Sequence, residues 1–318
     1  MRASRKGKLG ILVPYSTQYG LGHFYRNQHF VDQFPDAIFL TDKLGNEENS
    51  IQEITIDDRF EIELIKREVG VLLIDHYFLD DEQLLALRSL SEVVTIYFDP
   101  NLKTNSFDAV ISTNPFSKNN PDLTCKQFVG AEFFGFSKTV SKFKNGLAKE
   151  KDQVFICIGG SDPKELTGKI LEAIDKSEMK IKAILGPAVE ISYRERLVEK
   201  FNTYPNIELL HSPNNFHELL SKSQFAILSC STVTYEAILL ETPFVAIQYA
   251  QNQEELKRYY ISNGVKVVPQ EEIRRYFSDS KFIQETKNPR VQFSTKLAEL
   301  YEYISLNLER IDNKQEIG

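Results

Sequence analysis

The sequence predicts two doubly wound α/β domains, each a parallel sheet covered by helices. The chain has 318 residues, about twice the usual length of one domain. Short apolar runs alternate with stretches of helical periodicity along most of it, which is the rhythm of βαβ units. A polar, Lys-rich segment interrupts that rhythm once, after which it restarts. We therefore expect an N-terminal domain over residues 1–140, a linker over 141–152 and a C-terminal domain over 153–318.

Each half of the chain supplies its own set of strands and helices. The first half places strands at 9–13, 37–40, 71–75, 93–98 and 109–112, with helices near 23–34, 58–68 and 81–90. The second half places strands at 154–158, 182–185, 207–210, 225–228 and 244–248, with helices near 163–174, 193–202, 216–222, 232–240 and 253–262. A last helix, with apolar residues spaced from 293 to 308, is assigned to the C-terminal domain. Parallel sheets bind ligands at the carboxyl ends of their strands, so the loops after strands are the candidate sites.

Composition excludes several classes of protein. Lys and Arg number 38 against 45 Asp and Glu, so the chain lacks the basic surplus of a nucleic-acid-binding protein. No apolar run approaches the roughly 18 residues of a membrane span, and the apolar stretch behind the basic N-terminus is too short for a signal peptide. The three cysteines are widely separated and match no metal-binding spacing. We expect a cytoplasmic protein with no metal, no cofactor and no stable membrane insertion.

Two loops of the first half carry candidate catalytic side chains. The loop after the first strand contains Gly20 and Gly22, followed by His23 and, one turn later, Arg26. Glycines let a backbone approach a ligand closely, and a histidine can titrate near neutral pH; a glycine-rich turn with a surface histidine is the alternative. Tyr77, after the third strand, would orient a water or a substrate hydroxyl, or is simply packed. The third glycine of a dinucleotide fingerprint is missing, which argues against a dinucleotide cofactor.

The first loop of the second half is a candidate anion site. Gly159, Gly160 and Ser161 follow a predicted strand, and a proline then opens a helix. Glycines before a helix N-terminus suit a diphosphate. A plain turn, with Asp162 as the helix cap, is the alternative.

A hydroxyl-rich loop later in the second half predicts the rest of a nucleotide site. Ser231 and Thr232 enter a helix, where backbone N–H groups and hydroxyls favour phosphate. Glu236 follows about one turn later and would bind the two hydroxyls of a ribose, or else close a capping box. Asn252 follows the next strand.

In this order the motifs resemble the bacterial UDP-2,4-diacetamido-2,4,6-trideoxy-β-L-altropyranose hydrolases of pseudaminic acid biosynthesis, relatives of the MurG-like GT-B glycosyltransferases. The resemblance extends across roughly residues 8–268. It rests on residues 20–23 with Arg26, 74–77, 156–162, 231–237 and 252–253.

The resemblance implies a GT-B-like fold, in which two Rossmann-like domains face a central cleft. It also implies a metal-independent hydrolase that cleaves the anomeric C–O bond of a UDP-linked amino sugar, with inversion, to give UDP and free sugar. His23 would be the catalytic histidine that activates water, and Tyr77 would place water or substrate. The diphosphate would be held by loops 159–161 and 231–232, the ribose by Glu236 and the sugar or phosphate end by Asn252.

Two other functions remain open at this level. A glycosyltransferase of the same fold would use His23 to deprotonate an acceptor hydroxyl instead of water. A nucleotide-sugar-binding protein would keep the second-half loops without catalysis. The first half carries no recognisable apolar acceptor surface or membrane-binding helix, which favours water over an acceptor.

Overall fold

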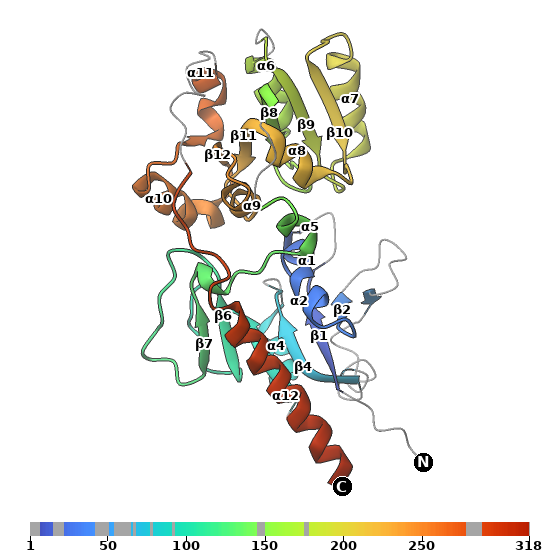
Figure 1. Cartoon of the computed structure of the whole chain (residues 1–318), viewed down its shortest axis with the longest axis vertical. Helices are drawn as coiled ribbons and strands as arrows, with labels where there is room; N and C mark the ends of the chain where they lie inside the picture. The colour runs from blue at the N-terminus through green and yellow to red at the C-terminus, as the bar shows by residue number, and fades with distance from the viewer. Residues whose placement is uncertain are drawn as a thin grey trace. The chain divides into compact units, whose positions relative to one another are not determined.

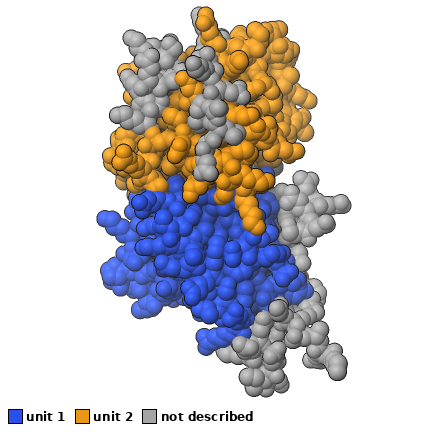
Figure 2. Space-filling view, in the orientation of Figure 1, with its two compact units in different colours: residues 1–137, 292–318 blue, residues 138–291 orange. Residues whose placement is uncertain are grey.

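The computed structural model describes residues 7–14, 22–41, 51–53, 65, 68–76, 79–90, 93–144, 150–174, 178–277 and 288–317. It divides the chain into two compact units (Figure 2). The first unit comprises residues 1–137 and 292–318, and the second comprises residues 138–291.

Within the described residues, the first unit holds a seven-stranded parallel sheet in the order β3-β2-β1-β4-β5-β6-β7. The strand order reverses between β1 and β4, which makes the carboxyl ends of these two strands the topological switch point. The strands are β1 Lys8–Leu12, β2 Ile38–Thr41, β3 Ile51–Glu53, β4 Val69–Ile74, β5 Val94–Phe98, β6 Ala109–Ser112 and β7 Lys126–Val129.

The helix predicted over residues 23–34 is interrupted at Asn27. It forms α1 (Gly22–Arg26) and α2 (Gln28–Gln33), with Asn27 between them. The Asn27 side chain donates to the carbonyl oxygen of His23 at 2.7 Å and to a buried carboxylate at 2.6 Å. The bond to the carboxylate joins Asn27 to a residue 48 positions away, which no local periodicity could predict. The described part of the unit also holds α4 Asp81–Arg88, η1 Ala131–Phe133 and α12 Leu297–Ile317, and residues 65 and 68 are helical.

The C-terminal helix belongs to the first unit, so its expected assignment to the C-terminal domain is wrong. Helix α12 packs against β1 and β4 (Figure 1). Its Leu300 and Ile304 are buried in the same core as Ile11 and Leu73. The predicted apolar stripe is present, but helical periodicity indicates only that one face is buried and does not identify the core that buries it.

Within the described residues, the second unit holds a six-stranded parallel sheet in the order β10-β9-β8-β11-β12-β13. Its switch point lies between β8 and β11. The strands are β8 Glu150–Cys157, β9 Lys180–Leu185, β10 Ile207–His211, β11 Ser223–Ser229, β12 Phe244–Gln248 and β13 Val267–Pro269. The helices are α5 Lys138–Ser141, α6 Leu166–Ile174, α7 Ile191–Phe201, α8 Phe216–Lys222, α9 Val233–Leu239, η2 Gln251–Gln253, α10 Glu254–Ser262, η3 Gln270–Glu272 and α11 Ile273–Phe277.

All ten predicted strands are present, whereas β3, β7 and β13 were not predicted. Each of these three is only three or four residues long and lies at the edge of its sheet. Such short segments form strands because the neighbouring strand supplies backbone hydrogen-bond partners. Their own sequence is too short to show the alternation of a strand. The predicted linker over 141–152 overlaps the end of α5 and the start of β8, and residues 145–149 lie outside the described part.

A buried histidine joins α12 to the rest of the first unit. His29 is 4% exposed, and its Nδ1 shares a hydrogen bond of 2.7 Å with the Tyr301 hydroxyl of α12. Gly135 fits against the imidazole so closely that an added methyl would lie 2.3 Å from ring atoms. Burial lowers the pKa of His29 to about 3, so the ring stays neutral at physiological pH.

We expect this histidine to make the first unit sensitive to acid. Below pH about 6.5 the unfolded chain binds a proton at this residue that the folded chain does not bind. The free energy of unfolding should therefore fall as the pH drops below that value, by up to about 1.4 kcal/mol per pH unit. Urea titrations followed by circular dichroism between pH 5 and 7 measure the slope. His29→Gln, which keeps an acceptor for Tyr301, should reduce it, and His211→Gln at an exposed site should not; equal slopes in all three proteins would refute the assignment.

Candidate functional site

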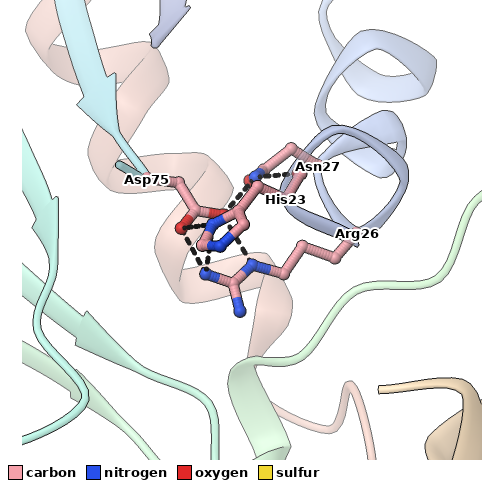
Figure 3. A network of polar contacts seen from close by, with 4 residues as sticks. All are labelled: His23, Arg26, Asn27 and Asp75. Atoms are coloured by element: carbon pink, nitrogen blue, oxygen red, sulfur yellow. Dashed lines mark hydrogen bonds and ion pairs between the residues drawn. The ribbon is translucent and has the colours of Figure 1, made fainter. Parts of the chain in front are cut away.

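The first candidate site lies at the switch point of the first sheet. Asp75 directly follows β4, and its N–H donates to the Leu12 carbonyl of β1 at 2.8 Å. The Asp75 side chain is fully buried. Helix α1 brings His23 and Arg26 to the same carboxylate, and Asn27 follows them (Figure 3). The chain thus places four polar side chains where β1 and β4 end.

The Asp75 carboxylate accepts four hydrogen bonds. Arg26 donates from Nε at 2.5 Å and also from Nη2. Asn27 donates from Nδ2 at 2.6 Å, and His23 lies with Nδ1 2.8 Å from the other carboxylate oxygen. Burial alone would raise the pKa of Asp75, but the charge of Arg26 and the bonds from Arg26 and His23 hold it well below its usual range. The carboxylate is therefore ionised throughout the physiological range.

Asp75 favours one tautomer of His23. An ionised carboxylate only accepts hydrogen bonds, so a proton on Nδ1 lets His23 donate to it and leaves the lone pair on Nε2. Arg26 Nη2 also lies 3.2 Å from the same Nδ1. Arg26 is held beside this pair by the face of Phe98, whose ring centroid lies 5.1 Å from the guanidinium carbon. A carboxylate-oriented imidazole of this kind can act as a general base.

The second candidate site surrounds Gly159, at the switch point of the second sheet. Gly159 follows β8 with φ +84°, a conformation that favours glycine. A methyl group at this position would lie 3.7 Å from the Ser229 hydroxyl and 3.8 Å from the Tyr249 hydroxyl. The Ser229 and Ser231 hydroxyls are 2.8 Å apart. Hydroxyl groups from the ends of β11 and β12 therefore converge on the glycine turn.

Asp162 is the cap of helix α6. Its carboxylate accepts from the N–H groups of Leu166 at 2.8 Å and Thr167 at 2.9 Å. The first amides of α6 are thus already bonded, as the cap alternative for this loop expects. Anion binding by Gly159, Gly160 and Ser161 stays a prediction.

A second glycine supports the turn. A methyl group on Gly186 would lie 2.4 Å from the Gly160 carbonyl oxygen and 2.6 Å from that of Gly159. The same Gly160 oxygen accepts from the Ala188 N–H at 2.9 Å. Backbone packs directly on backbone here, so the turn cannot move without residues 186–188.

Tyr249 is a further residue at this edge that the motifs did not single out. Its backbone N–H donates to the Gln253 side-chain oxygen at 2.9 Å, and its carbonyl accepts from the Lys164 ammonium at 2.6 Å. Burial, followed by the charge of Asp162, raises the pKa of Tyr249 to about 12. Its hydroxyl therefore remains protonated and can donate. The rule that loops after strands carry function would have found it, since it follows β12 directly.

The structure places the other predicted residues as follows. Thr232 stands at the start of α9 and makes no side-chain cap bond. Glu236 lies in the first turn of α9, where His217 contacts it at 3.3 Å. Asn252 is exposed on η2. Gly20 and Tyr77 lie outside the described residues.

The described part of the chain contains no group of three His, Cys, Asp or Glu side chains arranged to hold a metal ion. Its helices include none with the length and apolar character needed to cross a membrane.

No family model matches the chain. The chain is 28% identical to the UDP-2,4-diacetamido-2,4,6-trideoxy-beta-L-altropyranose hydrolase of Campylobacter jejuni over 267 residues, which span 79% of this chain and 95% of that one. Among solved structures it is similar to Acinetobacter baumannii MurG, with a TM-score of 0.57 at 14% identity, covering 97% of this chain and 99% of that one. It is also similar to the UDP-GlcNAc 2-epimerase of Methanocaldococcus jannaschii in complex with UDP-GlcNAc and UDP, with a TM-score of 0.56 at 12% identity, covering 94% and 99%. These likenesses confirm the predicted GT-B-like fold.

Neutralising Asp75 should both destabilise the first unit and disturb His23. Asp75→Asn leaves the Arg26 guanidinium without a counter-charge, and breaking a buried pair of this kind typically costs about 3 kcal/mol. The amide can also donate to His23 Nδ1, which would move the imidazole proton to Nε2. Urea denaturation measures the first effect, and ¹⁵N NMR of the imidazole nitrogens measures the second. Asp80→Asn at the exposed cap of α4 is the control and should change stability by less than about 0.5 kcal/mol; the same small change for Asp75→Asn would contradict the role given to it.

Gly186→Ala should displace the backbone of the glycine turn that packs against residue 186. Its methyl group would overlap backbone atoms of Gly159 and Gly160, which must shift at a cost of about 1–3 kcal/mol. We expect a lower midpoint of thermal unfolding for the second unit. Gly22→Ala, where an added methyl meets no described atom within 4 Å, should not lower it. Unchanged thermal unfolding of Gly186→Ala would mean that the turn is not held in this way.

Proposed function

We propose that this chain is an enzyme that hydrolyses a UDP-linked amino sugar to UDP and free sugar. The observation that carries the proposal is the Asp75–His23 pair at the carboxyl edge of the first sheet, with Nδ1 held 2.8 Å from the carboxylate. The glycine and hydroxyl turn at the equivalent edge of the second sheet supports it, because such a turn suits a diphosphate. The likeness to the Campylobacter jejuni hydrolase supports the substrate class.

In the proposed reaction, His23 acts as the general base. Its Nε2 accepts a proton from a water molecule as the water oxygen attacks the anomeric carbon of the sugar. The bond between that carbon and the β-phosphate oxygen breaks, and the electron pair leaves with UDP. Attack from the face opposite the leaving group inverts the anomeric configuration. Asp75 keeps the imidazole in the reactive tautomer and stabilises the imidazolium that forms.

The second unit would bind the nucleotide. Gly159, Gly160 and Ser161, with Ser231 and Thr232, would donate to the diphosphate and stabilise the charge that grows on it as it leaves. Glu236 would accept from the ribose hydroxyls, and Asn252 would contact the sugar or phosphate end. The proposal requires that both sites engage one molecule of nucleotide sugar. Gly20, Gly22, Arg26 and Tyr77 remain predicted contacts of the first site.

A glycosyltransferase is the second candidate, because the same histidine pair can deprotonate an acceptor hydroxyl as readily as water. A panel of UDP-amino sugars, incubated with the protein and no acceptor and followed by ¹H NMR, decides between them. The hydrolase releases free sugar, with the opposite anomer appearing first. Turnover only after an acceptor is added would establish the transferase. UDP binding without any turnover would identify a binding protein.

Replacing His23 tests the mechanism directly. His23→Asn should lower the hydrolysis rate at least about 100-fold, since general-base catalysis contributes 10²–10⁴-fold, and should leave UDP affinity within about twofold. In the unchanged protein the rate should fall towards acid pH, because a protonated imidazole cannot accept the proton from water. Initial rates between pH 5 and 9 measure both effects. An acid limb that persists unchanged in His23→Asn would remove the histidine from the mechanism.

A further inference from the structure

We infer that His217 is a positioning residue for Glu236 and holds its carboxylate ready for the ribose of the nucleotide. This inference rests on the proposed function and adds to it a residue from α8. His217 lies at the second position of α8, and its Nε2 is 3.3 Å from Oε2 of Glu236 on α9. The two side chains are 22% and 24% exposed, respectively. The contact is therefore partly shielded from water while the carboxylate stays accessible to a ligand.

The structure leaves the Glu236 carboxylate available for this role. In the capping-box alternative, the carboxylate would be engaged at the start of α9. Thr232 occupies the N-cap position of α9 and makes no side-chain cap bond, and no capping box is formed there. The partner that the structure gives to the carboxylate is His217 from a different helix.

The charge of Glu236 is also felt near the glycine turn. Burial, and then the negative charges of Glu236 and Asp162, raise the pKa of the Cys157 thiol to about 12. Cys157 ends β8, two residues before Gly159, so the Glu236 charge acts at the switch point. Glu236 is four residues beyond Thr232, which is about 6 Å along a helix axis. That offset is of the size that separates a phosphate from the ribose hydroxyls of one nucleotide.

His217 is itself held in place by aromatic packing. Its ring packs at 80° to Phe216, with centroids 5.2 Å apart, and Phe216 packs edge-on against the buried Phe155 at 5.2 Å. Phe155 belongs to β8, so the imidazole is anchored through one intermediate ring to the strand that carries the glycine turn. A firmly seated donor is what a positioning role requires.

The proposed effect of His217 follows from the flexibility of the Glu236 side chain. Glutamate has three side-chain torsions, and ordering them costs free energy when the ligand binds. The contact of His217 Nε2 with Oε2, at 3.3 Å, orders the side chain beforehand. The carboxylate lone pairs can still accept from two neighbouring hydroxyls. Without His217 the same bonds to ribose can form, but the ordering cost falls on the binding step.

The test measures how far binding depends on the ribose hydroxyls. Isothermal titration calorimetry gives the affinity of each protein for UDP and for 2′,3′-dideoxy-UDP, and their ratio is the ribose preference. His217→Phe keeps a ring against Phe216 but loses the donor, and should reduce the preference about tenfold. His217→Gln keeps a side-chain N–H and should restore most of it. Affinity for the dideoxy nucleotide should stay within about twofold in both variants.

Two further variants make the inference specific. Glu218→Gln, the control, removes a charge from the same helix by breaking the pair with Lys222 and should leave the ribose preference unchanged. In a Glu236→Ala background, His217→Phe should have no further effect, because the two residues act as one unit. A full effect in that background would show that His217 acts elsewhere.

The outcomes separate this inference from the proposed function. If the unchanged protein binds UDP and prefers it over the dideoxy form, but His217→Phe keeps that preference, then the positioning role is overturned and the nucleotide site stands. If the unchanged protein binds no UDP, the proposed function itself fails. If circular dichroism shows that His217→Phe is unfolded, His217→Ala takes its place, with the same expected loss and the same overturning result.

Discussion

A single buried carboxylate, Asp75, determines the local structure of the first site. A charge removed from water is tolerated only when it is paired and hydrogen-bonded, and Asp75 meets this condition through Arg26, Asn27 and His23. These bonds tie α1 and Asn27, where the helix breaks, to the residue that follows β4, and they favour a proton on Nδ1 of the histidine. The same carboxylate thus serves both the local backbone and the chemistry proposed for His23.

The second unit prepares its site by different means. Its glycine turn is held by direct backbone packing against Gly186, and its polar groups are hydroxyls and amides at the ends of β8, β11 and β12. Backbone amides and hydroxyls can bind a dianionic ligand with few positive side chains. The proposed nucleotide site is therefore compatible with a chain whose net charge is −7. Asp162 already accepts from the first amides of α6, so the anion contacts that we propose are those of the turn.

Several features of the structure cannot be predicted from the pattern of apolar and polar residues in the sequence. Strands β3, β7 and β13 are too short to show a period and exist because a neighbouring strand offers its hydrogen bonds. The expectation places α12 in the wrong domain, because an apolar stripe shows that one face of a helix is buried but does not identify the core that buries it. Asp75 and Asn27 lie 48 residues apart in the chain and meet only in the folded unit. His217 belongs to no recognisable motif, and its contact with Glu236 exists only in the folded unit.

The sequence by itself determined the class of fold, the ten principal strands, and the loops in which polar and glycine residues gather at strand ends. It could do so because alternation of apolar runs with helical periods, and glycine before a helix, are local properties of the chain. Tertiary structure alone decided which side chains surround the Asp75 carboxylate and which residue lies beside Glu236. Both depend on atoms brought together from distant elements, and contacts of about 3 Å between such elements leave no local pattern in the sequence.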